Sequence, residues 1–123
     1  MRYVILIYQD EHRVRTLTRS ERDALEGEYH DFLDAAKASG LYLDGAPLRP
    51  TDTATTVRVR RGRRGVTDGP FAETREQLGG FVLIEARDLN QALDAAARIP
   101  GARTGSVEVR PVRNMHTHEE SRA

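Results

Sequence analysis

The sequence predicts an α+β domain of the split βαβ, or ferredoxin-like, type, in which an antiparallel sheet carries two helices on one face. Apolar runs typical of strands and apolar stripes of helical spacing alternate as strand, helix, strand, strand, helix, strand once an inserted hairpin is set aside. The 123 residues are enough for one hydrophobic core and too few for two. The predicted elements are a strand at 2–8, a loop at 10–15, a helix at 19–39, an irregular strand at 41–48, a strand at 53–60, a turn at 61–65, a strand at 81–86, a helix at 88–99 and a strand at 106–112.

The strands are predicted from their β-branched and aromatic residues. Residues 2–8 and 81–86 are apolar throughout, which indicates strands that are buried on both faces. Residues 53–60 alternate Thr and Val with Arg, a pattern typical of a half-buried strand with one face in water, and the basic turn at 61–65 closes a hairpin. Residues 41–48 contain Gly and Pro and therefore fit only an irregular or edge strand.

The helices are predicted from their start and stop signals. Thr18 followed by Glu21 is a capping-box pattern, which satisfies backbone N–H groups in the first turn and stabilises the helix start by roughly 1 kcal/mol. Asp88 and Gln91 repeat this spacing before the second helix. Gly40 is a natural stop for the first helix.

The predicted helices cover only one of the two faces of the predicted sheet. Two helices on one side leave the other side bare, although the strands at 2–8 and 81–86 are apolar on both faces. A second copy of the same sheet is the simplest cover. We therefore expect a homodimer in which two sheets pack face to face and bury on the order of 1,600 Å² or more.

Composition excludes several classes of protein. Nineteen basic and nineteen acidic residues balance, so no global positive field indicates nucleic-acid binding. No apolar run approaches the roughly 18 residues of a membrane span, and the N-terminal apolar stretch is too short for a signal peptide. The absence of cysteine excludes disulfides and thiol chemistry. No cofactor fingerprint is present, and a cytoplasmic protein is expected.

The most informative segment is the loop at residues 68–74, which reads Asp-Gly-Pro-Phe-Ala-Glu-Thr. Pro70 fixes its own φ and favours extended geometry at Gly69, so the loop is expected to present Phe71 and Glu73 in a set direction. Such a stiffened loop is a candidate ligand-binding segment, with Phe71, Glu73 and Arg75 as its ligand-binding residues.

Each polar residue of this loop has two interpretations. Asp68 is either a general base or an Asx-turn residue that bonds to the backbone of its own turn. Glu73 and Arg75 lie two positions apart and form either a polar clamp for a ligand or a surface ion pair worth less than about 1 kcal/mol.

His30 and Tyr8 are the other catalytic candidates. His30 follows Tyr29 on the first helix but is rotated about 100° from the apolar stripe, so it is either a boundary residue or a proton-transfer group. Tyr3 and Tyr8 are an odd number of positions apart and fall on opposite faces of the first strand. One tyrosine should therefore point away from the helices, as a packing residue or as part of a pocket.

Two charged clusters carry weaker signals. Arg60, Arg61, Arg63 and Arg64 form either a phosphate contact or a solvated hairpin tip, and the lack of interleaved aromatic residues favours the tip. The C-terminal segment His116-Thr-His118-Glu119-Glu120 resembles a metal chelator, but no second shell supports it, and no metal site is predicted.

Three segments together identify the chain as resembling the YCII-related, DGPF-domain family. They are Asp68-Gly-Pro-Phe-Ala-Glu-Thr-Arg-Glu-Gln-Leu-Gly-Gly-Phe81, Leu83-Ile-Glu-Ala86 and Gly105-Ser-Val-Glu-Val-Arg-Pro111. The resemblance covers residues 1–112 as a single domain and leaves 113–123 as a polar tail. It implies the dimeric α/β-barrel form of the ferredoxin-like fold.

The resemblance implies little about activity. A His–Asp pair credited to the YCII branch has no motif-level match in this chain, and the association of DGPF proteins with extracytoplasmic-function sigma factors does not settle chemistry. The leading hypothesis is a small-molecule-binding homodimer, including a cofactor-independent acid/base enzyme that uses Asp68, His30 and Tyr8. The alternative is a non-catalytic interaction module linked to such a sigma factor.

Overall fold

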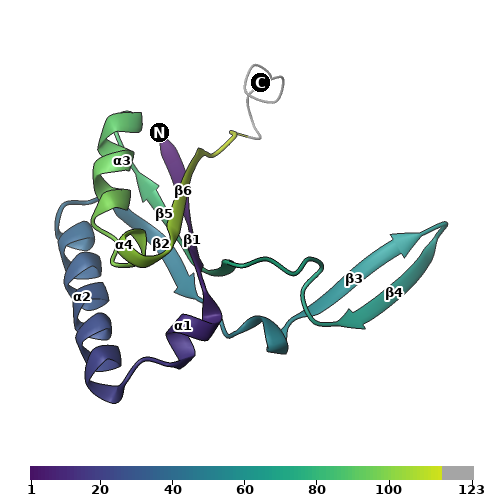
Figure 1. Cartoon of the computed structure of the whole chain (residues 1–123). Coiled ribbons are helices and arrows are strands. Elements are labelled where there is room, and N and C mark those ends of the chain that lie inside the picture. Colours follow the sequence, from purple (N-terminus) through teal and green to yellow (C-terminus); the bar gives the residue numbers. More distant parts are fainter. Residues whose placement is uncertain (115–123) are drawn as a thin grey trace.

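A computed structural model of the chain describes residues 1–114 and confirms the ferredoxin-like α+β class (Figure 1). The elements in order are β1 (Arg2–Gln9), α1 (Glu11–Arg15), α2 (Arg19–Ala38), β2 (Tyr42–Pro47), the 3-10 helix η1 (Thr51–Thr53), β3 (Thr55–Arg60), β4 (Arg63–Asp68), β5 (Gln77–Glu85), α3 (Leu89–Ala97), α4 (Gly101–Thr104) and β6 (Ser106–Pro111). Four of the strands form an antiparallel sheet in the order β2-β5-β1-β6, while β3 and β4 form a separate hairpin.

The hydrophobic core lies between the sheet and the helices α2 and α3, which lie on the same side of it (Figure 1). The central strands β1 and β5 supply alternate residues to this core, because successive side chains of a strand point to opposite faces. The helices supply mostly small residues, which allow close packing. The buried core residues are Tyr3, Ile5, Ile7, Phe32, Ala36, Val82, Ile84, Ala86, Ala92, Ala95, Ala96 and Ile99.

The opposite face of the sheet, here called the open face, is also apolar in its centre. Its central residues come from β1 and β5 and are paired across the strands, Val4 with Leu83 and Leu6 with Phe81. All four are only half-buried within one chain, and Tyr8 continues the same face of β1. Both central strands are thus apolar on two faces, as the sequence predicted.

The edge strand β2 is irregular, also as predicted. Its pairing with β5 shifts register between Tyr42 and Asp44, and it ends at Pro47. Proline has no N–H to donate to a ladder, so it is compatible with this edge position.

Helix α2 follows its predicted boundaries closely. Thr18 caps it, the backbone N–H of Glu21 donates to the Thr18 hydroxyl at 3.1 Å, and the Glu21 carboxylate accepts from the Thr18 backbone at 2.9 Å. At the other end Gly40 adopts a φ of 77°, a conformation that glycine adopts without strain.

The prediction of a loop at residues 10–15 was wrong, because the short helix α1 begins at Glu11. The Asp10 side chain caps it by accepting the backbone N–H groups of His12 and Arg13. The Glu11 carboxylate accepts the backbone N–H of Thr51 at 2.8 Å, and this contact fixes α1 against η1. A helix of five residues stabilised by a long-range contact leaves no apolar stripe to detect in the sequence.

The hairpin was predicted correctly, but its turn is shorter than the predicted range of 61–65. Only Arg61 and Gly62 separate the strands, with φ values of 52° and 75°. Positive φ at both central residues is the arrangement that matches the twist of a two-residue hairpin.

The half-buried character predicted for residues 53–60 was wrong for the single chain. We call residues 55–68 the hairpin arm, since β3 and β4 project away from the sheet on the side opposite the helices (Figure 1). Val57, Val59 and Val66 are 57%, 60% and 57% exposed. The expected alternation is present, but within the described residues no other element covers the apolar side.

Two further boundaries differ from the prediction. Strand β5 begins at Gln77, four residues before the predicted start, because Gly79 and Gly80 have no side chain to show a pattern yet still lie in the ladder. Helix α3 ends at Ala97, and the short helix α4 follows Pro100.

Candidate functional site

A cavity of about 460 Å³ lies between α2 and the sheet. That volume falls within the range of small-molecule sites, about 300–1,000 Å³. Its wall is mainly apolar and is drawn from β1, α1, α2, β2, β5 and α4. A few polar groups converge on it, namely Gln9, Glu26, Tyr29, His30, Tyr42 and Thr104.

Helix α2 forms one wall because its apolar stripe faces the sheet. Leu25, Tyr29 and Leu33 recur at helical spacing and line the cavity. His30, one position after Tyr29, lines it from the exposed border of the helix. Val14 of α1 is a further lining residue, and the contact between Glu11 and Thr51 holds that short helix in place.

The floor of the cavity is a tightly packed polar cluster. The Gln9 side-chain amide donates to the carbonyl of Gly101 at 3.1 Å, and the Thr104 hydroxyl donates to the Gln9 side-chain oxygen at 3.2 Å. A Cβ atom on Gly101 would overlap the Gln9 amide and lie 2.9 Å from the Tyr29 hydroxyl. Gly101 therefore allows α4, β1 and α2 to meet at one point.

The electrostatics of the cavity favour a neutral ligand. No Lys or Arg is among its lining residues, and Glu26 is its one carboxylate. Burial raises the pKa of the Tyr29 hydroxyl, an effect that a hydrogen bond from the Gly101 backbone and the charge of Arg103 partly oppose. Tyr29 therefore presents a neutral phenol across the physiological range.

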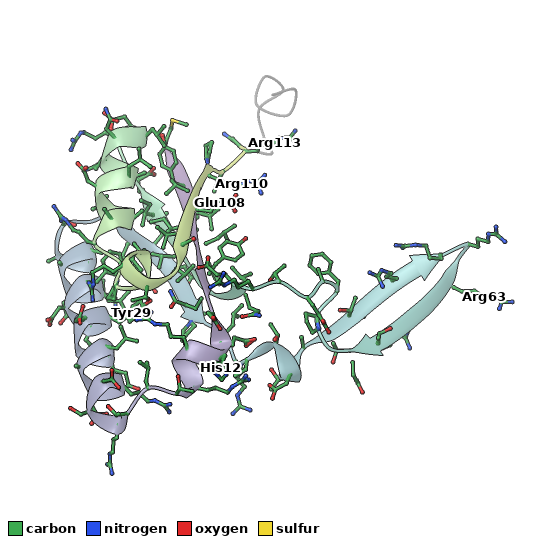
Figure 2. All side chains as sticks on the ribbon, viewed as in Figure 1. His12, Tyr29, Arg63, Glu108, Arg110 and Arg113 are labelled. Carbon is green, nitrogen blue, oxygen red and sulfur yellow. The ribbon has the colours of Figure 1, made fainter. Side chains whose placement is uncertain are left out.

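Of the three catalytic candidates, only His30 lies at this cavity. Tyr8 is on the open face, where its hydroxyl donates to Glu108 at 3.5 Å, whereas Tyr3 is buried in the core on the helix side. The two tyrosines are therefore on opposite faces, as predicted. Figure 2 shows Glu108 on β6 and Tyr29 on α2, on different sides of the sheet. One chain does not bring Tyr8 and His30 together.

Asp68 lies at the end of β4, opposite Thr55, and is exposed. The turn after it is closed by the Gly69 N–H, which donates to Ala54 at 2.7 Å, and by the Thr56 hydroxyl, which donates to the Gly69 carbonyl at 2.8 Å. Gly69 has a φ of 95°, so the extended geometry predicted for it was wrong; a left-handed turn residue is needed here. Among the described residues, the Asp68 carboxylate accepts no hydrogen bond, and the Asx-turn does not form.

The other predicted loop residues are also on the surface. Phe71 is 79% exposed, and Glu73 and Arg75 are exposed without an ion pair between them. The end of the loop is held by Glu76, whose carboxylate accepts from the Ser106 hydroxyl at 2.8 Å. None of the residues from 68 to 76 lines the cavity under α2.

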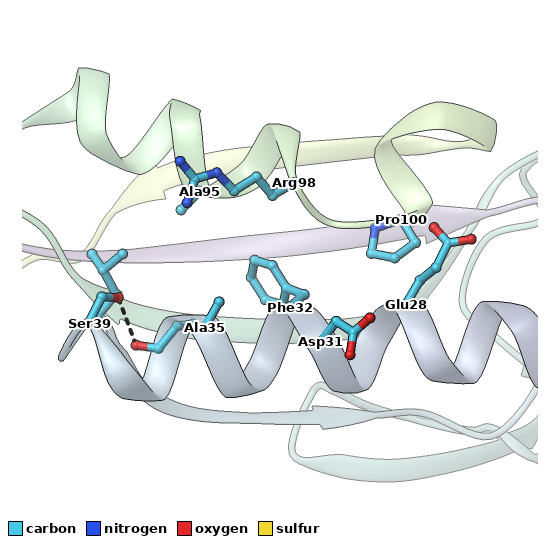
Figure 3. A pocket seen from close by; sticks show the side chains of 10 residues that line it. Glu28, Asp31, Phe32, Ala35, Ser39, Ala95, Arg98 and Pro100 are labelled. Atoms are coloured by element: carbon cyan, nitrogen blue, oxygen red, sulfur yellow. Dashed lines mark hydrogen bonds between the residues drawn. The ribbon is translucent and has the colours of Figure 1, made fainter.

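A second, smaller hollow of about 330 Å³ lies between α2 and α3 (Figure 3). Ala35 and Ala95 face it from the two helices, and Arg98 extends away from the carboxylates of Glu28 and Asp31. It gathers fewer aromatic and polar groups than the cavity under α2, which is the better candidate site.

Sequence reasoning missed most of the cavity wall. Tyr29 lies on the apolar stripe of α2, a position typical of core residues, while Gln9 and Tyr42 gave no signal because only the fold brings them to the same cavity. The one available signal was Gly101 itself, because a residue without a side chain fits where a strand and two helices converge.

Within residues 1–114, no group of three or more His, Asp or Glu side chains is arranged to hold a metal ion. The chelator-like segment at 116–120 lies outside the described residues. No helix in the described part of the chain is long and apolar enough to span a membrane.

Comparisons with known proteins match the chain over most of its length. The family model described as the YCII-related domain matches residues 1–116. The chain is also similar to an uncharacterised protein of Rhizobium meliloti (strain 1021), with 39% identity over 118 residues that cover 91% of this chain and 92% of that protein.

Proposed function

The chain belongs to the YCII-related family, and from that premise we propose that it binds a small neutral molecule, aromatic or lactone-like, in the cavity under α2. The observation that carries the proposal is the composition of the wall. Apolar residues surround the space, and a few hydrogen-bonding residues line it, which is the general form of a ligand site.

His30 is the residue that would give the site chemistry. Imidazole donates and accepts protons near neutral pH, and His30 lies on the wall beside the Tyr29 phenol. A ligand in the cavity would be in reach of both groups. The reaction class that fits is a cofactor-independent proton transfer, such as isomerisation next to a carbonyl group.

The binding proposal is tested by a thermal-shift screen against neutral aromatic compounds and lactones. A ligand at roughly a hundred times its dissociation constant adds about 2.7 kcal/mol, which raises Tm by several degrees for a domain of this size. Leu25→Trp should remove the shift by filling the cavity, whereas Leu93→Trp, on exposed α3 surface, should keep it.

Two further variants separate the roles of the candidate residues. Asp68→Asn should leave the shift unchanged, because Asp68 does not line the cavity. His30→Gln should keep binding within about threefold and abolish any turnover of the bound compound. If the increase in Tm persists in Leu25→Trp or is lost in Asp68→Asn, the ligand binds at the loop and not in the cavity. If no compound of the panel raises Tm, the binding proposal is wrong.

We also propose that the protein is a homodimer formed through its open faces. Val4, Leu6, Phe81 and Leu83 form an apolar centre on a sheet face that no helix of the same chain covers. Sheets with two apolar faces need cover on both. A second copy supplies that cover with an identical, self-complementary surface.

A further inference from the structure

The hairpin arm is the part of the chain that its own fold leaves least supported. It forms a two-stranded sheet of its own, and such an isolated hairpin is marginally stable in water. One side of the arm carries Val57, Val59 and Val66, with Val57 directly opposite Val66. The same side also carries Arg64 at the tip end, opposite Val59, and the pair Thr55 and Asp68 at the base. More than half of each valine is exposed, so this side has the composition of an interface.

We infer that the hairpin arm clasps a second copy of the chain, with its valine side against the flank of the partner and its arginine tip on the partner's helix α2. The inference rests on the dimer proposed above. It adds a second contact region, separate from the open faces.

The direction of the arm favours a second copy as its occupant. The helices lie on one side of the sheet and the arm projects beyond the other, the side of the open face (Figure 1). A copy packed on that face would lie beside the arm. The arm and the open face would therefore meet the same partner.

The length of the arm matches the thickness of that partner. Six residues per strand extend about 20 Å at roughly 3.4 Å per residue, whereas packed sheets lie about 10 Å apart. The arm would thus pass the partner's sheet and bring its tip to the layer of helices behind it.

The charges of the two elements are complementary. The tip carries Arg60, Arg61, Arg63 and Arg64, and α2 carries six carboxylates against three basic side chains. All ten of these tip arginines and α2 carboxylates are exposed in the single chain. Opposite charges on two surfaces of one protein steer its copies into register.

The first test compares two neighbouring substitutions on β4. Val66→Lys places a charge on the valine side, and Thr67→Lys places the same charge on the opposite side of the same strand. Sedimentation equilibrium of the full-length chain should show dimer affinity weakened about tenfold or more by Val66→Lys, the effect of removing a buried apolar anchor, and by less than about threefold by Thr67→Lys.

The second test locates the tip directly. The chain has no cysteine, so Arg61→Cys provides a single attachment point for a nitroxide spin label. In mixed dimers of spin-labelled and ¹⁵N-labelled chains, broadening of amide signals in the partner's α2 would support the inference.

These experiments distinguish failure of the inference about the arm from failure of the proposed dimer. A monomeric wild-type protein would overturn both proposals. If the protein is a stable dimer, its affinity is unchanged by Val66→Lys and no amide signal of α2 is broadened, the inference about the arm is wrong but the proposed dimer is not. Loss of binding to a labelled DNA duplex in Arg60→Glu and Arg63→Glu variants, with dimerisation unchanged, would assign the arm to nucleic acid instead.

Discussion

Gly101 is the residue on which the candidate site most depends. Any side chain there would push against the Gln9 amide and the Tyr29 hydroxyl, which form the cavity floor. Gly101→Ala should therefore lower the free energy of unfolding by about 1 kcal/mol, the lower end of the usual cost of overpacking, because the two closest atoms are the ends of flexible side chains, and it should weaken ligand binding. Urea denaturation measures the first effect and the thermal-shift screen the second.

Gly27 provides a matched control for that substitution. It lies in the middle of α2, and a Cβ atom there would meet nothing within 4 Å. Gly27→Ala should raise the free energy of unfolding by roughly 0.5–1 kcal/mol, because alanine loses less backbone entropy in a helix than glycine does. Equal effects of the two substitutions would contradict the close packing assigned to Gly101.

The start of α2 shows how the sequence controls an element. Hydrogen bonds from Thr18 lower the pKa of the Glu21 carboxyl. A carboxyl whose pKa is lower in the folded state contributes stability above its unfolded pKa, and this contribution is lost as pH falls through the folded value. Thr18→Ala should cost about 1 kcal/mol at neutral pH.

The contribution of Glu21 can be checked from the free energy of unfolding at acidic pH. In wild type the free energy of unfolding should decline below about pH 4.5, and part of this decline should be absent in Glu21→Gln. Chemical denaturation between pH 3 and pH 7 measures both curves. If the curves of wild type and Glu21→Gln coincide at acidic pH, the Thr18–Glu21 contact does not contribute to the free energy of unfolding.

The sequence predicted those elements whose signals are local. The helix α2 and the strand β1 carried caps or continuous apolar patterns, and both were found close to their expected boundaries. The helix α1 was missed although Asp10 caps it, because five residues form no apolar stripe and its other support comes from Thr51, forty positions away. The exposure of the hairpin arm was missed because alternating apolar and polar residues indicate that a strand has an apolar side but not whether another element covers that side.

The candidate site was less predictable than the fold, for a related reason. The turn at residues 68–70 was expected, but its geometry was not, because Gly69 adopts a left-handed φ of 95° where extended backbone was predicted. The loop nevertheless does not line the cavity, whose wall is assembled from six elements spread along the sequence. Of the residues singled out beforehand, His30 alone lies there.

At the scale of the whole molecule, the proposed dimer depends on the open face. Leu6→Asp places a charge at its centre and should give a species of 13.8 kDa where wild type gives twice that mass. Light scattering after size exclusion measures both. Leu93→Asp, on the exposed side of α3, serves as the control and should remain dimeric.

A dimeric Leu6→Asp protein would contradict packing through the open face. An unfolded variant is recognised by circular dichroism, and Val4→Lys then repeats the test at the neighbouring pair with Leu83. Monomeric Val4→Lys with native secondary structure supports the interface.

The irregularity of β2 has a consequence for the behaviour of the protein at high concentration. An edge strand with free N–H and C=O groups is a template for further strands and hence for fibrous aggregates. Here the shifted register near Tyr42 and the terminal Pro47 interrupt that template on one edge, and Pro111 ends the strand on the other. Both edges of this apolar sheet therefore offer only a short template for strand addition, which limits edge-to-edge aggregation.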